Sequence, residues 1–314
     1  MSGPPPAFRC ASAARERADP AAGSAPQARR WLLLEHPGPW PVDAITGAGL
    51  RESTLSLLQA SAQIGAARML LVRRPGRQDP QAERRWTVIG PDFETVSEPW
   101  TDGRNLLKAC LAMTQAAELP ELPQAPVILV CTHGVHDACC AIRGRPVAAA
   151  LAERWPDLVW ECSHVGGDRF APNVVLLPEG FYYGNLDPES AVRIVGDYLA
   201  GTVTTEGLRG VASASPPEQA AVVAAYERLG PLAPGAVMVR RSVQKGPHHG
   251  HGSETTVDLL IDGRAELIQV HVDAVRRPEA QLTCRATRAT PATEYRVRTF
   301  EPLPPPERRR RDWL

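Results

Sequence analysis

Short apolar runs alternate with amphipathic stretches along the first part of the chain, and the spacing of the apolar positions indicates the type of each element. Apolar runs bounded by glycine or proline are typical of buried strands, whereas apolar residues that recur every three or four positions are typical of helices. Between residues 30 and 119 the pattern predicts the order strand, helix, strand, strand, strand, helix. The predicted elements are Trp31–Glu35, Glu52–Ile64, Met69–Val72, Arg85–Ile89, Thr95–Ser97 and Asn105–Met113.

The same order of elements is predicted again between residues 124 and 211. Proline suits the first turn of a helix because its missing N–H is not needed there, so we expect Pro146 to begin a helix. The repeated order predicts two halves of the same α/β type. The predicted elements are Val127–Val130, Pro146–Glu153, Leu158–Glu161, Val174–Leu177, Phe181–Tyr183 and a helix that begins at Asp187-Pro188-Glu189.

The region after Ser213–Pro217 has a different pattern, with one helix followed by alternating strands. Asp262-Gly263 lies between two strand-like runs and is a strong hairpin signal. The region is predicted to be a small antiparallel α+β unit, and no motif in it indicates a chemistry. The predicted elements are a helix from Ser215 to about Leu229 and the strands Val237–Val243, Thr255–Ile261, Ala265–Val272, Gln281–Ala286 and Glu294–Phe300.

Composition narrows the possible classes of protein. The 314 residues include 35 basic and 35 acidic side chains, and this balance argues against broad nucleic-acid binding. No apolar run approaches the roughly 20 residues that span a bilayer, and the proline-rich start lacks the apolar centre of a signal peptide. Seven cysteines at irregular spacing fit a reducing compartment and use as ligands better than a disulfide framework. We therefore expect a cytoplasmic protein that associates with neither nucleic acid nor membrane.

Candidate ligands follow two of the predicted strands. Cys131 comes directly after the apolar run 127–130, and Cys140 lies further along the same stretch. His164 and Asp168 flank a Val-Gly-Gly turn. Thiolates hold iron–sulfur clusters, and imidazole can replace thiolate on one iron. Spacing alone leaves the alternative that Cys131 and Cys140 are small buried hydrophobic residues and that His164 is a core histidine.

The stretches CTHGVHDACCAIRGRPVAAAL and WECSHVGGDRFAPNVVLLPEGFYYG resemble the sucrase/ferredoxin-like family. The resemblance is specific from about Cys131 to Gly184 and looser over Arg30 to Gly76. It implies a thioredoxin-like [2Fe–2S] ferredoxin domain in which Cys131 and Cys140 are the two thiolate ligands and His164 is the first histidine ligand. Many members read His-x-Gly-Gly-His, whereas this chain has Asp168 in the last position.

Three residues are candidates for the fourth ligand. Asp168 is in register with the family pattern, and a carboxylate oxygen can bind ferric iron, although it is a harder ligand than cluster iron usually has. Cys162 is softer but lies six residues out of register. Cys139 adjoins Cys140 and would strain to reach the same cluster. Asp168 is preferred, with Cys162 as the alternative, and a turn-capping role for Asp168 stays open.

With this resemblance, the expected fold class is α/β: a thioredoxin-like ferredoxin domain at 124–211, preceded by a degenerate thioredoxin-like domain at 30–119 and followed by the α+β domain at 215–302. The first half has Glu35-His36 and Arg73-Arg74 where the second has its candidate ligands, so its loops carry no thiolate. Residues 1–29 are expected to form an N-terminal arm, and residues 303–314 a disordered basic tail.

The expected function is single-electron transfer by a [2Fe–2S] cluster. The chain lacks a glycine-rich dinucleotide fingerprint, so we expect electrons to come from a separate NAD(P)H-dependent reductase and to pass to an acceptor that the sequence does not identify. No placed pair of carboxylates supports sugar hydrolysis, so a sucrase is not expected. The alternatives are a thiol–disulfide oxidoreductase built on Cys131 and a structural zinc module on the same residues. The histidines around Gly250 are interpreted as an exposed loop.

Overall fold

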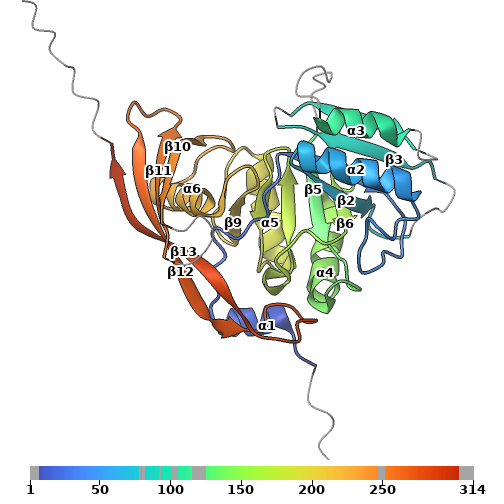
Figure 1. The fold of residues 1–314 in the computed structure, drawn as a ribbon, viewed down its shortest axis with the longest axis horizontal. Helices are drawn as coiled ribbons and strands as arrows, with labels where there is room; N and C mark the ends of the chain where they lie inside the picture. Colours follow the sequence, from blue (N-terminus) through green and yellow to red (C-terminus); the bar gives the residue numbers. More distant parts are fainter. Residues whose placement is uncertain are drawn as a thin grey trace, which may run out of the picture.

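The computed structural model describes residues 7–77, 79, 82–91, 93–100, 105–114, 125–246 and 252–303 (Figure 1). Residues 304–314 of the expected basic tail, residues 115–124 between the two halves, and the histidines His248, His249 and His251 lie outside the described residues.

Both halves contain the predicted order of elements. The first half consists of β1 (Arg30–Glu35), α2 (Glu52–Ile64), β2 (Ala67–Arg73), β3 (Arg85–Ile89), β4 (Thr95–Pro99) and α3 (Leu106–Thr114). The second half consists of β5 (Val127–Cys131), α4 (Ala138–Arg154), β6 (Val159–Cys162), β7 (Val174–Leu177), β8 (Phe181–Tyr183) and α5 (Pro188–Leu199). Helix α4 spans 17 residues, and no described helix is long and apolar enough to cross a membrane.

The two halves share one nine-stranded sheet with the order β4-β3-β1-β2-β6-β5-β7-β8-β9. Within each half, the first strand lies between a parallel second strand and an antiparallel third strand. The halves join where β2 pairs with β6 in the antiparallel direction, with Val72 opposite Cys162. The α/β class predicted from the sequence is confirmed, and the four-strand order is the same in both halves.

Helices α2 to α5 pack on one face of this sheet (Figure 1). Leu32 and Leu34 of β1 belong to one buried cluster with residues of α2 and α3, whereas Ile128 and Val130 of β5 belong to another with residues of α4 and α5. The alternate strand residues point to the opposite face, because successive side chains of a strand alternate. The N-terminal segment lies across that face, and Ala25 and Ala28 pack there against strand side chains from both halves.

Helix α4 begins eight residues before the predicted position. Asp137 caps its first turn, accepting a hydrogen bond from the Cys139 N–H at 2.8 Å, so the helix starts at Ala138 and Pro146 lies inside it. The prediction that Pro146 begins the helix was wrong. An interior proline removes one backbone hydrogen bond, but the Asp137 cap and the burial of Cys139 and Cys140 favour the longer helix. As a consequence, both cysteines lie in the first turn of α4.

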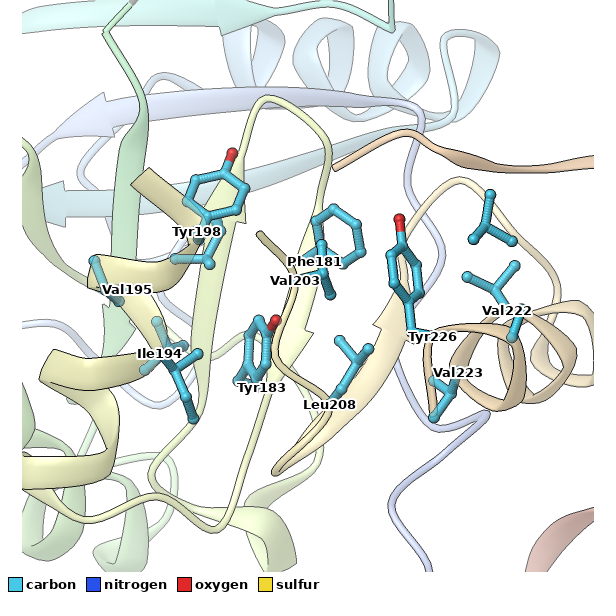
Figure 2. Packing of buried hydrophobic residues seen from close by; sticks show 14 of the residues in the cluster. Phe181, Tyr183, Ile194, Val195, Tyr198, Val203, Leu208, Val222, Val223 and Tyr226 are labelled. Carbon is cyan, nitrogen blue, oxygen red and sulfur yellow. The ribbon is translucent and has the colours of Figure 1, made fainter. Parts of the chain in front are cut away.

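The C-terminal region continues the core of the second half. Strand β9 (Leu208–Val211) extends the large sheet, and α6 (Pro216–Leu229) packs between this edge and a second sheet. Tyr226 of α6 contacts Phe181 of β8, with ring centroids 5.9 Å apart (Figure 2). The second sheet has the order β10-β11-β12-β13 and consists of β10 (Val237–Lys245), β11 (Glu254–Ile261), β12 (Ile268–Ala280) and β13 (Thr290–Pro302).

The segment Gln281–Ala286 is not the strand that its alternating pattern predicted. It forms the tip of the long antiparallel hairpin β12–β13, and Figure 1 shows this tip beside helix α1 (Cys10–Glu16). Distant partners hold this segment in place of a strand ladder. The Cys284 backbone N–H donates to Asp137 Oδ2 at 2.7 Å, and the Arg285 side chain donates to the Val135 carbonyl at 3.1 Å. The tip therefore lies against the start of α4.

Candidate metal centre

Cys131 lies at the carboxyl end of the buried strand β5, where α4 crosses it closely. A Cβ atom on Gly144 would lie 2.1 Å from the Cys131 carbonyl oxygen, so only glycine permits this crossing. The close approach places the first turn of α4, with Cys140, next to Cys131. The ligand atoms of Cys131, Cys140 and His164 all lie within 4.8 Å of one another. Both cysteines are almost completely buried, with exposed fractions of 1% and 0%.

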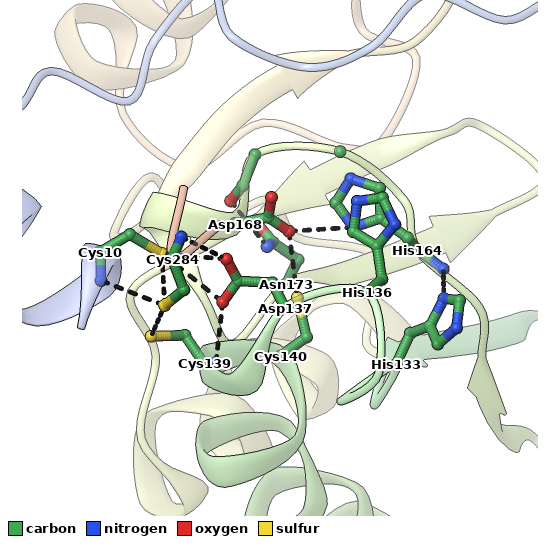
Figure 3. Close-up of polar contacts among 12 residues, drawn as sticks. Cys10, His133, His136, Asp137, Cys139, Cys140, His164, Asp168, Asn173 and Cys284 are labelled. Atoms are coloured by element: carbon green, nitrogen blue, oxygen red, sulfur yellow. Dashed lines mark hydrogen bonds and ion pairs between the residues drawn. The ribbon is translucent and has the colours of Figure 1, made fainter. Parts of the chain in front are cut away.

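His164 and Asp168 flank the turn that the sequence indicated. Gly166 and Gly167 have φ angles of +90° and +81°, which residues with a side chain rarely adopt, and they fold the chain back so that Asp168 faces Cys140. Asp168 Oδ1 lies 3.3 Å from Cys140 Sγ and 3.0 Å from His164 Nδ1 (Figure 3). The structure thus brings together all four preferred ligands of the sequence-based prediction.

A buried arginine holds this turn in place. Arg209 of β9 is fully buried and donates to the Gly166 carbonyl at 3.0 Å and to Asn173 Oδ1 at 2.6 Å. Asn173 in turn donates to the Gly167 carbonyl at 2.9 Å. Sequence reasoning did not identify Arg209, because it lies more than forty residues beyond the turn and β9 itself was not predicted.

His136 is a further candidate ligand that sequence reasoning did not single out. Its ring stacks on that of His164 with centroids 3.8 Å apart, and the ligand atoms of His136, His164 and Asp168 lie within 4.8 Å of one another. Nδ1 of His136 lies 3.2 Å from the Val42 carbonyl, which can only accept. The proton is therefore assigned to Nδ1, and Nε2 retains a lone pair for a metal. The sequence could have indicated His136 as a candidate ligand, since it belongs to the same loop as Cys131.

His133 has a positioning contact in the same loop. Its Nε2 lies 2.7 Å from the Pro41 carbonyl, and its Nδ1 accepts a hydrogen bond from the His164 backbone N–H at 3.2 Å. Both ring nitrogens are thus engaged. The first half of the chain supplies no thiolate here, but the loop after β1 provides the carbonyls of Pro41 and Val42 that fix the two histidines.

Electrostatics within the group favour one thiolate, one thiol and a charged histidine–aspartate pair. The hydrogen bond from Cys140, with help from His164, lowers the pKa of Cys131 well below its ordinary value despite burial. The same contact, together with burial, raises the pKa of Cys140. Burial disfavours the charged imidazole of His164, but Asp168 and Cys131 outweigh it and raise its pKa to about 9. Burial also acts against the Asp168 carboxylate, yet His164 and Cys140 hold its pKa below the usual range.

The two alternative ligands, Cys162 and Cys139, lie differently. Cys162 neighbours Cys131 in the parallel β5–β6 pairing and is fully buried, but it belongs to none of the groups of close ligand atoms among the described residues. Burial, followed by the Cys131 charge, raises its pKa well above the ordinary value. The Cys139 side chain points away from Cys140, toward Cys284, whose sulfur lies 3.5 Å from its own (Figure 3).

The residues present fit a small iron–sulfur cluster. Two buried sulfur atoms face the imidazole of His164, and the ligand atoms of these three residues lie within 4.8 Å of one another. His164 Nδ1 lies 3.0 Å from Asp168 Oδ1, and a metal ion bound to both atoms would displace the proton between them. Thiolate and imidazole ligands on one site are the donor set of a [2Fe–2S] centre of mixed ligation.

One protein-family model matches this chain. The model of the family described as sucrase/ferredoxin-like matches residues 21–210, which is more than half of the chain and contains every candidate ligand named so far. No curated protein and no solved structure matches the chain.

Proposed function

Because the chain belongs to the sucrase/ferredoxin-like family, we propose that it is a [2Fe–2S] protein that carries single electrons. The observation that supports this most is the convergence of Cys131, Cys140 and His164, whose ligand atoms lie within 4.8 Å of one another at the end of β5. A bound cluster would supply reversible one-electron chemistry.

In this proposal each ligand has a separate role. Cys131 and Cys140 hold the inner iron, and their burial excludes water from the sulfur atoms. His164 and Asp168 hold the outer iron. Arg209 fixes the Gly166-Gly167 turn and so keeps these two side chains at their separation of 3.0 Å. Its buried positive charge also favours the reduced form of a cluster that gains negative charge.

His136 competes with Asp168 as the fourth ligand. An imidazole is the ligand that many family members have in the position of Asp168, and His136 offers Nε2 beside His164. Asp168 remains the first choice, because its oxygen lies next to both Cys140 and His164.

Electron transfer would take place on the histidine side of the centre. His164 has 20% of its side chain exposed, and a shallow pocket beside it is lined by His136, Asp168, Val42, Thr283, Arg285 and Ala286. We propose that a separate NAD(P)H-dependent reductase docks there, since the chain has no dinucleotide fingerprint of its own. We propose the cytoplasm as the compartment, since seven irregularly spaced cysteines suit a reducing environment.

A thiol–disulfide oxidoreductase is the second candidate, favoured by the lowered pKa of Cys131. It is less well supported, because only 1% of Cys131 is exposed and a substrate disulfide would have to reach its sulfur.

Anaerobic purification followed by iron and acid-labile sulfide analysis tests the proposal. We expect equal amounts of iron and sulfide, visible charge-transfer bands, and loss of both in Cys131→Ser and Cys140→Ser. Cys110→Ser is the control, because Cys110 lies in α3 within the core of the first half. A colourless protein, or iron that persists in Cys131→Ser, would refute the proposal.

A further inference from the structure

Three cysteines and one aspartate from distant parts of the chain meet in a second group. Cys10 is the first residue of α1, Asp137 and Cys139 begin α4, and Cys284 lies at the tip of the β12–β13 hairpin (Figure 3). Their ligand atoms all lie within 4.8 Å of one another, and none of the four belongs to the Cys131–Cys140–His164 group.

The separations match those around a single tetrahedral ion. Cys284 Sγ lies 3.5 Å from Cys139 Sγ and 3.6 Å from Cys10 Sγ, and Cys10 Sγ lies 3.6 Å from the Asp137 oxygens. Zn–S bonds of about 2.3 Å and Zn–O bonds of about 2.0–2.2 Å place two sulfurs about 3.8 Å apart, and a sulfur and an oxygen about 3.5–3.7 Å apart. A four-iron cluster, with each thiolate on a different iron, would need wider spacing.

The carboxylate is already oriented by the backbone. Asp137 Oδ1 accepts from the Cys139 N–H at 2.8 Å, and Oδ2 accepts from the Cys284 N–H at 2.7 Å. Each oxygen has a second lone pair, so these bonds fix the carboxylate without using up its capacity to bind a metal. Such outer hydrogen bonds are the usual support of metal ligands.

Positively charged side chains lie beside this group. A bound divalent ion would convert the three cysteine sulfurs to thiolates. Arg15 lies near Cys139, and Arg169 near Cys10, so that guanidinium groups offset the negative charge of a site with three thiolates and a carboxylate.

A disulfide does not account for the whole group. A Cys139–Cys284 disulfide would use two of the four residues and would not account for Cys10, whose sulfur lies 3.6 Å from both Cys284 Sγ and the Asp137 oxygens. Three soft sulfurs and one carboxylate around one point match the ligand preferences of zinc.

We propose that Cys10, Asp137, Cys139 and Cys284 bind one zinc ion. The ion ties α1 and the hairpin tip to the start of α4, where the neighbouring residue, Cys140, faces the first group. This zinc site is structural, since all four positions are taken by the protein.

Zinc analysis of the full-length chain, purified without a histidine tag, tests the proposal. We expect one zinc per chain, and zinc K-edge X-ray absorption should show three sulfur neighbours at about 2.3 Å and one oxygen neighbour at about 2.0–2.2 Å. Cys284→Ser should lose most of the zinc and keep its iron, while Cys110→Ser should keep both metals. Cys131→Ser should lose iron and keep zinc, which separates this site from the proposed cluster.

Three results would overturn the zinc site. The first is the absence of zinc from the folded wild-type chain. The second is a Cys139–Cys284 disulfide found by non-reducing peptide mapping. The third is additional iron in place of zinc, lost on Cys284→Ser. Since Cys284 is only partly buried, Cys284→Ser should fold, and the absorption spectrum of the wild type tests the coordination without any variant.

Discussion

Cys139 and Cys140 are consecutive in the sequence, but their sulfur atoms belong to two different groups of candidate ligands. Cys139 Sγ lies 3.5 Å from Cys284 Sγ, whereas Cys140 Sγ lies 3.3 Å from Asp168 Oδ1. Successive side chains of a helix point about 100° apart, so the first turn of α4 directs one sulfur to each group. A movement of this turn would therefore disturb both groups together.

Replacing the proposed fourth ligand should identify it. If Asp168 binds iron, Asp168→His should retain the cluster and raise its reduction potential, because a neutral imidazole stabilises added electron density better than a carboxylate does. Asp168→Ala should make the cluster labile, as judged by the loss of visible absorbance over time. Cys162→Ser is the control and should keep the cluster. A stable cluster in Asp168→Ala combined with a lost one in His136→Ala would assign the ligand to His136.

The reduction potential should depend on pH through His164. Reduction adds negative charge and raises the pKa of the free N–H of an iron-bound imidazole, so the reduced state keeps its proton to higher pH. Between the two pKa values the potential should fall as pH rises, by up to about 59 mV per unit. Voltammetry from about pH 6 to 10 measures this slope. A slope that persists in His164→Cys with an intact cluster would show that another group is coupled.

The metal-free protein should contain a thiolate at neutral pH. The Cys140 hydrogen bond lowers the pKa of Cys131, so Cys131 should remain ionised well below the ordinary thiol value of about 8.5. Ultraviolet thiolate absorbance should be lost in Cys131→Ser and retained in Cys162→Ser, because burial raises the pKa of Cys162. A thiolate signal that Cys131→Ser leaves unchanged would contradict the assignment.

Gly144→Ala should destabilise the protein although alanine favours helices. The added Cβ would lie 2.1 Å from the Cys131 carbonyl oxygen, so α4 must move away from β5, at a cost of about 1–3 kcal/mol. Gly196→Ala in α5 is the matched control, since its Cβ would meet Trp155 at an ordinary 3.8 Å and should stabilise by about 0.5–1 kcal/mol. Chemical denaturation and iron content measure both effects. Equal stability changes for the two variants would contradict the close crossing.

Arg209→Met should weaken the Gly166-Gly167 turn. The change leaves Asn173 Oδ1 and the Gly166 carbonyl without their donor, at a cost of about 1–3 kcal/mol in the free energy of unfolding. The cluster should also be lost faster. Arg193→Met, which removes an exposed ion pair with Glu206, should cost less than about 1 kcal/mol. If Arg209→Met matches this control in both measurements, Arg209 does not position the turn.

The sequence by itself determined the local structure and the residue types of the first group. Apolar runs and helical spacing are local properties, so they predicted the element order of both halves, and the glycines of the 164–168 turn indicated that His164 and Asp168 converge. Only the tertiary structure decided which side chains from distant segments meet. Arg209 reaches the Gly166-Gly167 turn from an unpredicted strand, across 43 residues of the chain. Cys10 and Cys284 meet Asp137 across 127 and 147 residues. No spacing rule within one segment reports such contacts, because only the packing of the whole chain brings their partners together.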